Sequence, residues 1–387
     1  MYRIIRRLAY FLVASSLAFS ASSCEFRTGT VNGSEDDDQD LPNDTPNTPQ
    51  ENEDPVETSI PFSRTPEIPD YKLPQETFLD DLEKEASDII DHAIEKAIAY
   101  VSVMKDARHS QISYSYDEDT DGYISKLSEN ELELYRNIVE AAKTGVPFSI
   151  KETEYDGDLK DAYFSISETL FSVEPGISSY FMIEPETHML VGEETTRYTS
   201  VFALYFDPYA DGNKTVRNGD VTQEEVIHAA ELLDRVVKRI VRFMPEDLTT
   251  YDKYYYLAAV LSEQANFDKR PDNCFTAFGA LITRKAVCEG YAAAYMLLCK
   301  EANLWVGYKS GFADNGKERA GHVWNLIKLE DGIYNVDVTW SDGYGMPYER
   351  DWYDHFIKSD ELFEDSGHEP QTGLASTGVY APNPYEK

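Results

Sequence analysis

Apolar residues recur every three or four positions in four separate stretches of the chain, and this spacing predicts amphipathic helices. The stretches cover residues 89–101, 132–139, 226–240 and 249–264. Ser128 with Glu131 and Thr222 with Glu225 precede the second and third stretches in the order of a capping box, which marks a helix start. Pro245 ends the third helix, because proline cannot continue one.

Residues 146–206 differ from these helices, since alternating, β-branched and aromatic stretches are separated there by Gly and Pro. We interpret this region as a small sheet with strands at residues 163–167 and 200–206. A second strand pattern follows later, where residues 321–329 and 333–340 flank the turn signal Asp331-Gly332 and predict a hairpin. The chain shows no internal repeat, and the mixed pattern predicts an α+β fold.

The charge balance excludes one class of function. The 387 residues include 35 basic and 71 acidic ones, which gives a net charge of −36. Binding to nucleic-acid backbones requires clustered Lys and Arg, so we expect no nucleic-acid partner. Hydrophobic residues make up 42% of the chain, enough for one large or two modest domains. The four cysteines form no CxxC pair, so neither a disulfide scaffold nor a structural zinc site is expected.

Residues 1–23 have the pattern of a signal peptide, in which arginines precede a short apolar stretch and four small residues. Cys24 follows directly, which resembles a bacterial lipobox, where the first mature cysteine carries a lipid that tethers the protein to a membrane. An ordinary cleaved secretory peptide is the alternative, and both predict an exported protein. Residues 24–75 hold eight of the 18 prolines and several acidic runs, so we predict a solvated tether there.

An acidic stretch after residue 116 matches part of an EF-hand-type calcium loop. The matching residues are Asp117, Asp119, Asp121, Gly122 and Ile124. The last ligand of such a loop should be a bidentate Glu, but that position is Ser128, which the capping box already uses. We therefore favour an acidic turn and assign no metal.

Cys288 has the surroundings of a reactive thiol. It stands ahead of an Ala- and Leu-rich stretch that favours a helix, so the sulfur is expected at or near a helix N-terminus. Free backbone N–H groups and the positive end of the helix dipole favour the thiolate over the thiol there. The N–H of Cys288 is also a natural donor to an oxyanion.

His322 and Asp337 lie on the two arms of the predicted hairpin. If the tight turn is at Asp331-Gly332, Asp337 pairs opposite Leu326, on the same face of the sheet as His322. At roughly 3.3 Å per residue this leaves Asp337 about 13 Å from His322 along the strand. A looser loop or a bulge has to close that gap.

The segments AVCEGYA, GHVWNLIKL and IYNVDVTW, which hold these three residues, resemble the transglutaminase-like superfamily of papain-related cysteine enzymes. The resemblance covers roughly residues 245–365 and implies an α+β domain in which a helix bearing the cysteine packs on an antiparallel sheet bearing the histidine and the aspartate. It implies that Cys288 is the nucleophile, His322 the general base and acid, and Asp337 the residue that fixes the imidazole tautomer.

Two assignments stay open at this point. Asp342 is close enough in sequence to be an alternative third residue. A second oxyanion donor could come from Gln264, Trp324 or Trp340. The remaining histidines, at positions 92, 109, 188, 228, 355 and 368, show no metal-binding spacing such as HExxH.

The resemblance implies an exported enzyme that hydrolyses or transfers acyl groups at amide bonds, through a thioester and without a cofactor or metal. The expected substrates are peptides, protein glutamines or cell-wall peptides. A catalytically silent surface module that binds peptide or glycan through the same cleft is the alternative. The expected organisation is a signal peptide at 1–23, a tether at 24–75, an N-terminal α+β region at 76–220 and the catalytic domain at 221–387.

Overall fold

The computed structural model describes residues 68–73, 84–104, 112–117, 122–144, 146, 148–151, 155–176, 181–188, 196–206, 213–215, 222–270, 274–316, 319–371 and 373–378. The predicted signal peptide, Cys24, Asp119, Asp121 and all but residues 68–73 of the predicted tether region lie outside these ranges. Among the described residues, no helix combines the length and the apolar character that crossing a membrane requires.

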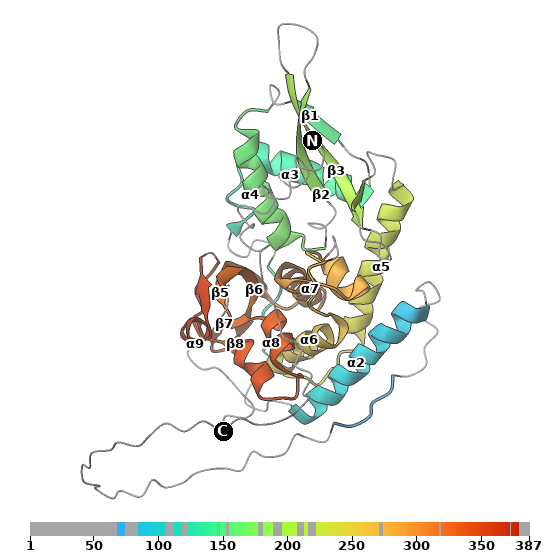
Figure 1. Ribbon diagram of the computed structural model, residues 1–387, viewed down its shortest axis with the longest axis vertical. Coiled ribbons are helices and arrows are strands. Elements are labelled where there is room, and N and C mark those ends of the chain that lie inside the picture. Colours follow the sequence, from blue (N-terminus) through green and yellow to red (C-terminus); the bar gives the residue numbers. More distant parts are fainter. Residues whose placement is uncertain are drawn as a thin grey trace, which may run out of the picture.

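The C-terminal half packs helices against an antiparallel sheet whose strands follow the order β8-β7-β6-β5-β9 (Figure 1). The strands are β5 (Val306–Asp314), β6 (Arg319–Leu329), β7 (Gly332–Val336), β8 (Phe356–Lys358) and β9 (His368–Pro370). The helices of this half are α5 (Gln223–Arg242), α6 (Thr250–Gln264), η3 (Gly279–Thr283), α7 (Cys288–Glu301), α8 (Val338–Tyr344), η4 (Asp351–His355) and α9 (Asp360–Asp365). The mixture of helices with one antiparallel sheet confirms the predicted α+β class.

A smaller α+β unit precedes this half, and Figure 1 shows it at the far end of the molecule from α8. Its helices are α3 (Glu129–Thr144) and α4 (Leu159–Val173), and its strands are β1 (Phe148–Lys151), β2 (Phe181–His188), β3 (Thr196–Phe206) and β4 (Asn213–Thr215). The strands form an antiparallel sheet in the order β1-β3-β2, with β4 paired to β3. The two helices share a separate small core around Ile138 and Ile166.

The predicted strand at residues 163–167 is wrong, because this segment lies inside helix α4. Ala162, Ile166 and Leu170 are buried four positions apart, so they form one face of a helix that packs on α3. Asp158 caps this helix by accepting a hydrogen bond from the Asp161 N–H at 3.3 Å. The predicted strand at 200–206 is part of β3.

Helix α2 (Lys84–Met104) falls in the region predicted as N-terminal, but it packs with the C-terminal half. Its buried face shares one core with α5, α6 and α7. The guanidinium of Arg239 on α5 donates two hydrogen bonds to the Asp91 carboxylate on α2, at 2.6 and 2.7 Å. Helix α2 is therefore part of the scaffold that supports the C-terminal sheet.

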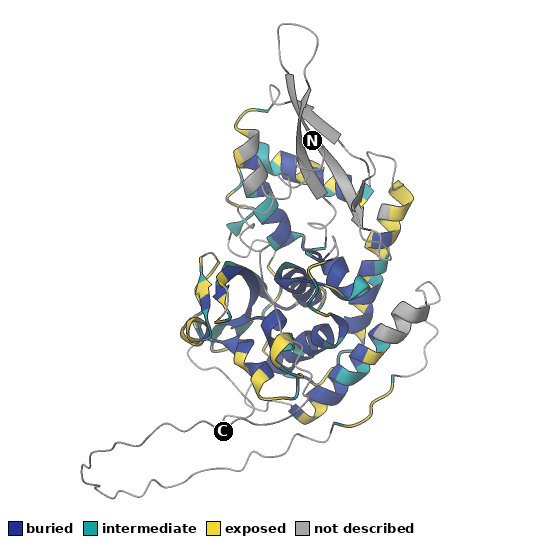
Figure 2. Cartoon of the chain, in the orientation of Figure 1, coloured by how far each residue is buried: buried dark blue, intermediate teal, exposed yellow. Residues whose placement is uncertain are grey.

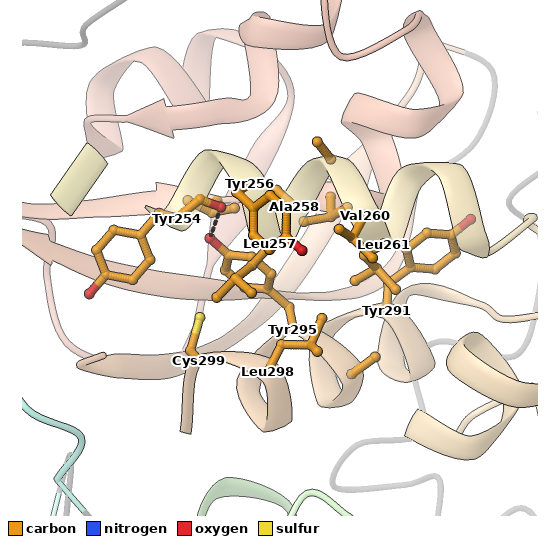
Figure 3. Packing of buried hydrophobic residues seen from close by; sticks show 14 of the residues in the cluster. Tyr254, Tyr256, Leu257, Ala258, Val260, Leu261, Tyr291, Tyr295, Leu298 and Cys299 are labelled. Carbon is orange, nitrogen blue, oxygen red and sulfur yellow. Dashed lines mark hydrogen bonds between the residues drawn. The ribbon is translucent and has the colours of Figure 1, made fainter. Parts of the chain in front are cut away.

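The centre of the core is the contact between α6 and α7 (Figure 3). The Tyr295 hydroxyl on α7 donates to the Tyr254 carbonyl on α6 at 3.1 Å, and the Tyr254 hydroxyl donates to the Trp305 carbonyl at 2.6 Å. These hydroxyls allow large rings to be buried without unpaired polar atoms. Figure 2 shows that most residues of both helices are buried.

The predicted helix starts agree with the structure. Ser128 and Glu131 form the expected capping box of α3, and Thr222 and Glu225 form that of α5. Ser128 is the N-cap of α3, and its hydroxyl accepts the Glu131 N–H. This is the role that the acidic-turn interpretation gave to Ser128.

The predicted hairpin forms from β6 and β7, but its return strand is shorter than predicted. The ladder ends at Val336, and residues 338–340, predicted as strand, begin helix α8. Asp337 causes the change, because its Oδ1 accepts a hydrogen bond from the Trp340 N–H at 3.2 Å as the N-cap of α8.

Candidate active site

Cys288 is the first residue of α7, as the helix pattern predicted, and it is buried with 5% of its surface exposed. The chain enters the helix through Val287, whose N–H donates to the Cys274 carbonyl at 2.9 Å. Gly290 makes this close approach possible, since a Cβ atom there would lie 2.5 Å from the Cys274 carbonyl oxygen. The first turn of α7 therefore packs directly against the backbone at Cys274.

His322 lies on β6, and its Nε2 atom is 2.6 Å from Oδ2 of Asp337. Both side chains are almost fully buried. The hairpin register explains how they meet. Leu329 pairs with Gly332 and Asn325 with Val336, so the turn is one residue earlier than the predicted Asp331-Gly332 and Asp337 follows the last pair of the ladder.

The corrected register closes the gap that the sequence left open. If the ladder continued, Asp337 would face Trp324, two residues from His322, instead of Leu326, four residues away. The backbone leaves the sheet at this point, where the Asp337 N–H donates to the His355 carbonyl at 2.9 Å. The carboxylate covers the remaining distance to the imidazole, so no bulge between β6 and β7 is needed.

The electrostatics of His322 connect it to Cys288 as well as to Asp337. Burial alone would lower the pKa of His322, but the charges of Asp337 and Cys288 outweigh burial and raise it to about 10. Nε2 is engaged by Asp337, whereas the Cys288 thiol acts on His322 through its charge and a side-chain hydrogen bond. Nδ1 is therefore the ring atom left for the thiol, and the imidazole at neutral pH carries both protons.

The Asp337 carboxyl is held in its ionised form. Burial by itself would raise its pKa, but the neighbouring His322 and His368, which donate to it, keep the pKa well below the usual range. An ionised carboxylate beside a protonated imidazole accepts the Nε2 hydrogen and so fixes the ring orientation.

A second histidine, His368 on β9, also contacts this carboxylate, with its Nε2 atom 3.1 Å from Asp337 Oδ2. No local sequence pattern pointed to this residue, because β9 has only three residues and its pairing with β5 joins segments far apart in the chain. The alternating pattern that identifies longer strands needs at least four residues.

Aromatic rings surround the buried imidazoles. The His322 ring lies 5.9 Å from Trp324 and 5.7 Å from Trp340, and His368 lies 4.4 Å from Phe363. His355 shares this cluster, 5.1 Å from Trp340, and burial lowers its pKa to about 3. Such a setting excludes water and strengthens the charge interactions inside it.

The structure separates the residues that the sequence left as alternatives. Asp342 lies away from the imidazole and accepts a hydrogen bond from the Tyr291 hydroxyl at 2.6 Å. Trp324 donates its indole N–H to Asn335 Oδ1 at 2.9 Å, so this group is not available for an oxyanion. Gln264 donates from Nε2 to the Leu281 carbonyl at 2.9 Å, which commits one of its two amide hydrogens.

His322, Asp337 and His368 also form a group whose ligand atoms all lie within 4.8 Å of one another. A tetrahedral zinc ion with bonds of about 2.0–2.1 Å would keep two ligand atoms about 3.3 Å apart. The 2.6 Å between His322 and Asp337 is too short for that arrangement and fits a hydrogen bond. We therefore assign no metal to these residues.

Comparison with known proteins points to one family. Residues 236–338 match the family described as the transglutaminase-like superfamily, and this segment includes Cys288, His322 and Asp337. A crystal structure described as that of a TGase matches 42% of this chain at 13% identity, with a TM-score of 0.24, and the match spans 45% of that chain. No curated protein matches the sequence. Residues 236–338 thus match the transglutaminase-like superfamily, the family that the three sequence segments resemble.

Proposed function

We propose that the protein is an exported cysteine-dependent enzyme that cleaves or transfers acyl groups at amide bonds. The observation that carries this proposal is the placement of His322, which is hydrogen-bonded to Asp337 at 2.6 Å on one side and electrostatically coupled to Cys288 on the other. Membership of residues 236–338 in a transglutaminase-like domain supports the same chemistry.

In the proposed first half-reaction, the Cys288 sulfur attacks the carbonyl carbon of the amide, and the carbonyl π bond opens to an oxyanion. As the first residue of α7, Cys288 has a backbone N–H with no acceptor inside the helix, and this N–H can donate to the oxyanion. His322 then gives a proton to the nitrogen of the leaving amine as the carbon–nitrogen bond breaks. A thioester on Cys288 remains.

In the second half-reaction, water or another amine attacks the thioester carbonyl. His322 removes the proton from the attacking group, and the carbon–sulfur bond breaks to restore the thiolate and the protonated imidazole. Throughout, Asp337 keeps the Nε2 hydrogen of His322 pointed at itself, so that Nδ1 is the atom that exchanges protons at the sulfur. The products are an acid after hydrolysis or a new amide after transamidation.

The proposed location follows from the sequence before residue 76. We propose that the signal-like residues 1–23 direct export and that a lipid on Cys24 anchors the domain to a membrane through the acidic tether. The proposed substrates are peptides, protein glutamines or cell-wall peptides. Fractionation of cells that express wild type and Cys24→Ala tests the anchor, since the variant should leave the membrane fraction, and a soluble wild-type protein would contradict the lipid.

Trapping the thioester tests the chemistry directly. The purified protein is mixed with a library of glutamine-containing and other peptides, quenched in acid and analysed by mass spectrometry for an acyl group on Cys288. We expect the adduct in wild type and none in Cys288→Ala. Peptide binding without adduct or amide turnover would favour a silent binding module instead.

A further inference from the structure

We propose that His368 is a positioning residue of this site, a neutral imidazole that donates its Nε2 hydrogen to Asp337 Oδ2 and holds that oxygen against His322. Its kinetic consequence rests on the proposed function, whereas its effect on His322 in the resting protein does not. His368 lies outside the residues 236–338 that match the family.

The geometry gives Asp337 Oδ2 two imidazole partners. His322 Nε2 lies at 2.6 Å and His368 Nε2 at 3.1 Å, and the two rings are 5.5 Å apart. The other oxygen, Oδ1, accepts the Trp340 N–H at 3.2 Å. His368 is fully buried, and β9 fixes it on the edge of the sheet, where it pairs with Ala313 of β5.

The hydrogen positions follow from Asp337 and Ser366. Its Oγ atom lies 3.0 Å from His368 Nδ1 and 2.8 Å from the Phe363 carbonyl oxygen, but a hydroxyl has one hydrogen. The Phe363 carbonyl already accepts the Ser366 N–H at 3.1 Å. The ionised Asp337 carboxylate can only accept, so the hydrogen of the neutral His368 ring lies on Nε2, and the Ser366 hydroxyl can donate to Nδ1 without leaving the Phe363 carbonyl unpaired.

The surrounding charges keep His368 neutral. Burial, which is the largest influence, and the charge of His322 together lower the pKa of His368 by more than the Asp337 carboxylate and a hydrogen bond with the Phe363 backbone raise it. The other titratable groups that act on this cluster include Cys288 and Tyr291 on α7, His355 on η4 and Lys358 on β8. A neutral donor holds the carboxylate without cancelling its charge, so Asp337 still stabilises the protonated form of His322.

The position of Asp337 depends on this second donor. Without it, the carboxylate keeps only the α8 N–H as an anchor apart from His322 itself. The carboxylate would then turn toward the helix terminus, and the interaction that raises the pKa of His322 would weaken. Loss of His368 should therefore lower the pH at which His322 releases its proton.

The test compares His368→Leu with His368→Gln, whose amide N–H can reach the same oxygen. His355→Leu is the matched control, because His355 is buried in the same aromatic cluster and contacts Asp337 only through its backbone carbonyl. The first measurement is the titration of His322 by imidazole nitrogen NMR, which needs no turnover. The second is kcat and KM on an amide substrate.

We expect His322 to titrate at lower pH in His368→Leu, with kcat reduced about 10- to 100-fold and KM nearly unchanged, as for loss of a hydrogen bond to a charged group. His368→Gln should restore most of both values, and His355→Leu should leave both near wild type. An unchanged His322 titration in His368→Leu, or an equal shift in His355→Leu, would overturn the proposal. If the protein has no amide activity, the proposed function fails while the NMR titration still decides the role of His368.

Ser366→Ala covers the case in which His368→Leu does not fold. Without the hydroxyl, His368 Nδ1 loses the partner at 3.0 Å that supports the Nε2–H tautomer, so the His322 titration should move in the same direction by a smaller amount. A Ser366→Ala protein that folds and titrates as wild type would contradict the assigned hydrogen position.

Discussion

Oδ2 of Asp337 lies 2.6 Å from Nε2 of His322, although the two residues are 15 positions apart and only one of them is in the sheet. The carboxylate has two tasks, since Oδ2 binds the imidazole while Oδ1 caps α8. Because Asp337 is the N-cap of α8, the start of this helix sets the direction of the side chain that orients His322.

Replacing Asp337 by Asn should keep the cap but give His322 a neutral partner, because the amide oxygen can still accept the Trp340 N–H. By analogy with other such triads, we expect kcat to fall by about 10⁴-fold with little loss of stability. Asp342→Asn is the control, since Asp342 bonds Tyr291 and not His322. A damaging Asp342→Asn with a mild Asp337→Asn would show that the third residue is assigned wrongly.

The cysteines should differ sharply in reaction with iodoacetamide. Cys288 lies at the start of α7 beside a protonated imidazole, whereas burial raises the pKa of the Cys299 thiol far above its usual range. Cys274 is fully buried too. Among Cys274, Cys288 and Cys299, we expect mass spectrometry of the native protein to find alkylation at Cys288 alone. Faster labelling of Cys299 or Cys274 would mean that the site does not activate its thiol.

The contribution of Asp342 to the stability of the protein should fall as pH rises from about 4 to 7. Burial raises the pKa of this carboxyl from 3.8 to about 7, so the folded state keeps a proton that the unfolded state releases between these pH values. The part of the unfolding free energy that Asp342 contributes therefore decreases over this range, while His355, whose pKa is lowered to about 3, contributes with the opposite sign. Urea unfolding of Asp342→Asn across this range should give a flatter curve than wild type, and parallel curves would contradict the assignment.

His322 should make the unfolding free energy depend on pH in a second, more alkaline range. Its pKa is raised from 6.5 to about 10, so the stability that it contributes is complete below pH 6.5 and lost as pH rises through 10. In His322→Gln, the decrease in unfolding free energy over this window should disappear. His355→Gln should retain it, since His355 has a pKa of about 3 and stays neutral there.

Gly311 on β5 is the point where β9 approaches most closely. A Cβ atom at this position would lie 2.1 Å from the Glu369 carbonyl oxygen, which is backbone and cannot move aside alone. Gly311→Ala should therefore displace β9 and reduce both stability and amide turnover, with a cost of about 1–3 kcal/mol in unfolding free energy. Gly176→Ala, whose new methyl would meet only Leu297 at 3.5 Å, should be nearly silent in both measurements.

The helices and the position of Cys288 at a helix start were the most predictable parts of this fold. Capping boxes and periodic apolar residues are local signals, so α3, α5 and the start of α7 follow from short segments. The strand predicted at 163–167 failed because alternation and a four-residue apolar repeat coexist there, and packing of Ile166 on α3 decided for the helix.

The site was predictable only in part, because its geometry depends on packing between elements as well as on local signals. His322 and Asp337 could be placed on one sheet face by parity, but their distance depended on where the hairpin turns, a shift of a single residue. His368 reaches the carboxylate through a three-residue strand paired with β5, a contact that depends on the whole sheet and on no local pattern.

Strands β8 and β9 occupy opposite edges of the sheet, although only α9 and a short turn separate them along the chain. During synthesis, Cys288, His322 and Asp337 all emerge before the strand that carries His368. Until β9 docks, β5 is an open edge that can pair with other chains. A nascent chain that ends before residue 368 therefore lacks the second donor to Asp337, so the docking of β9 is the step at which the proposed active site becomes complete.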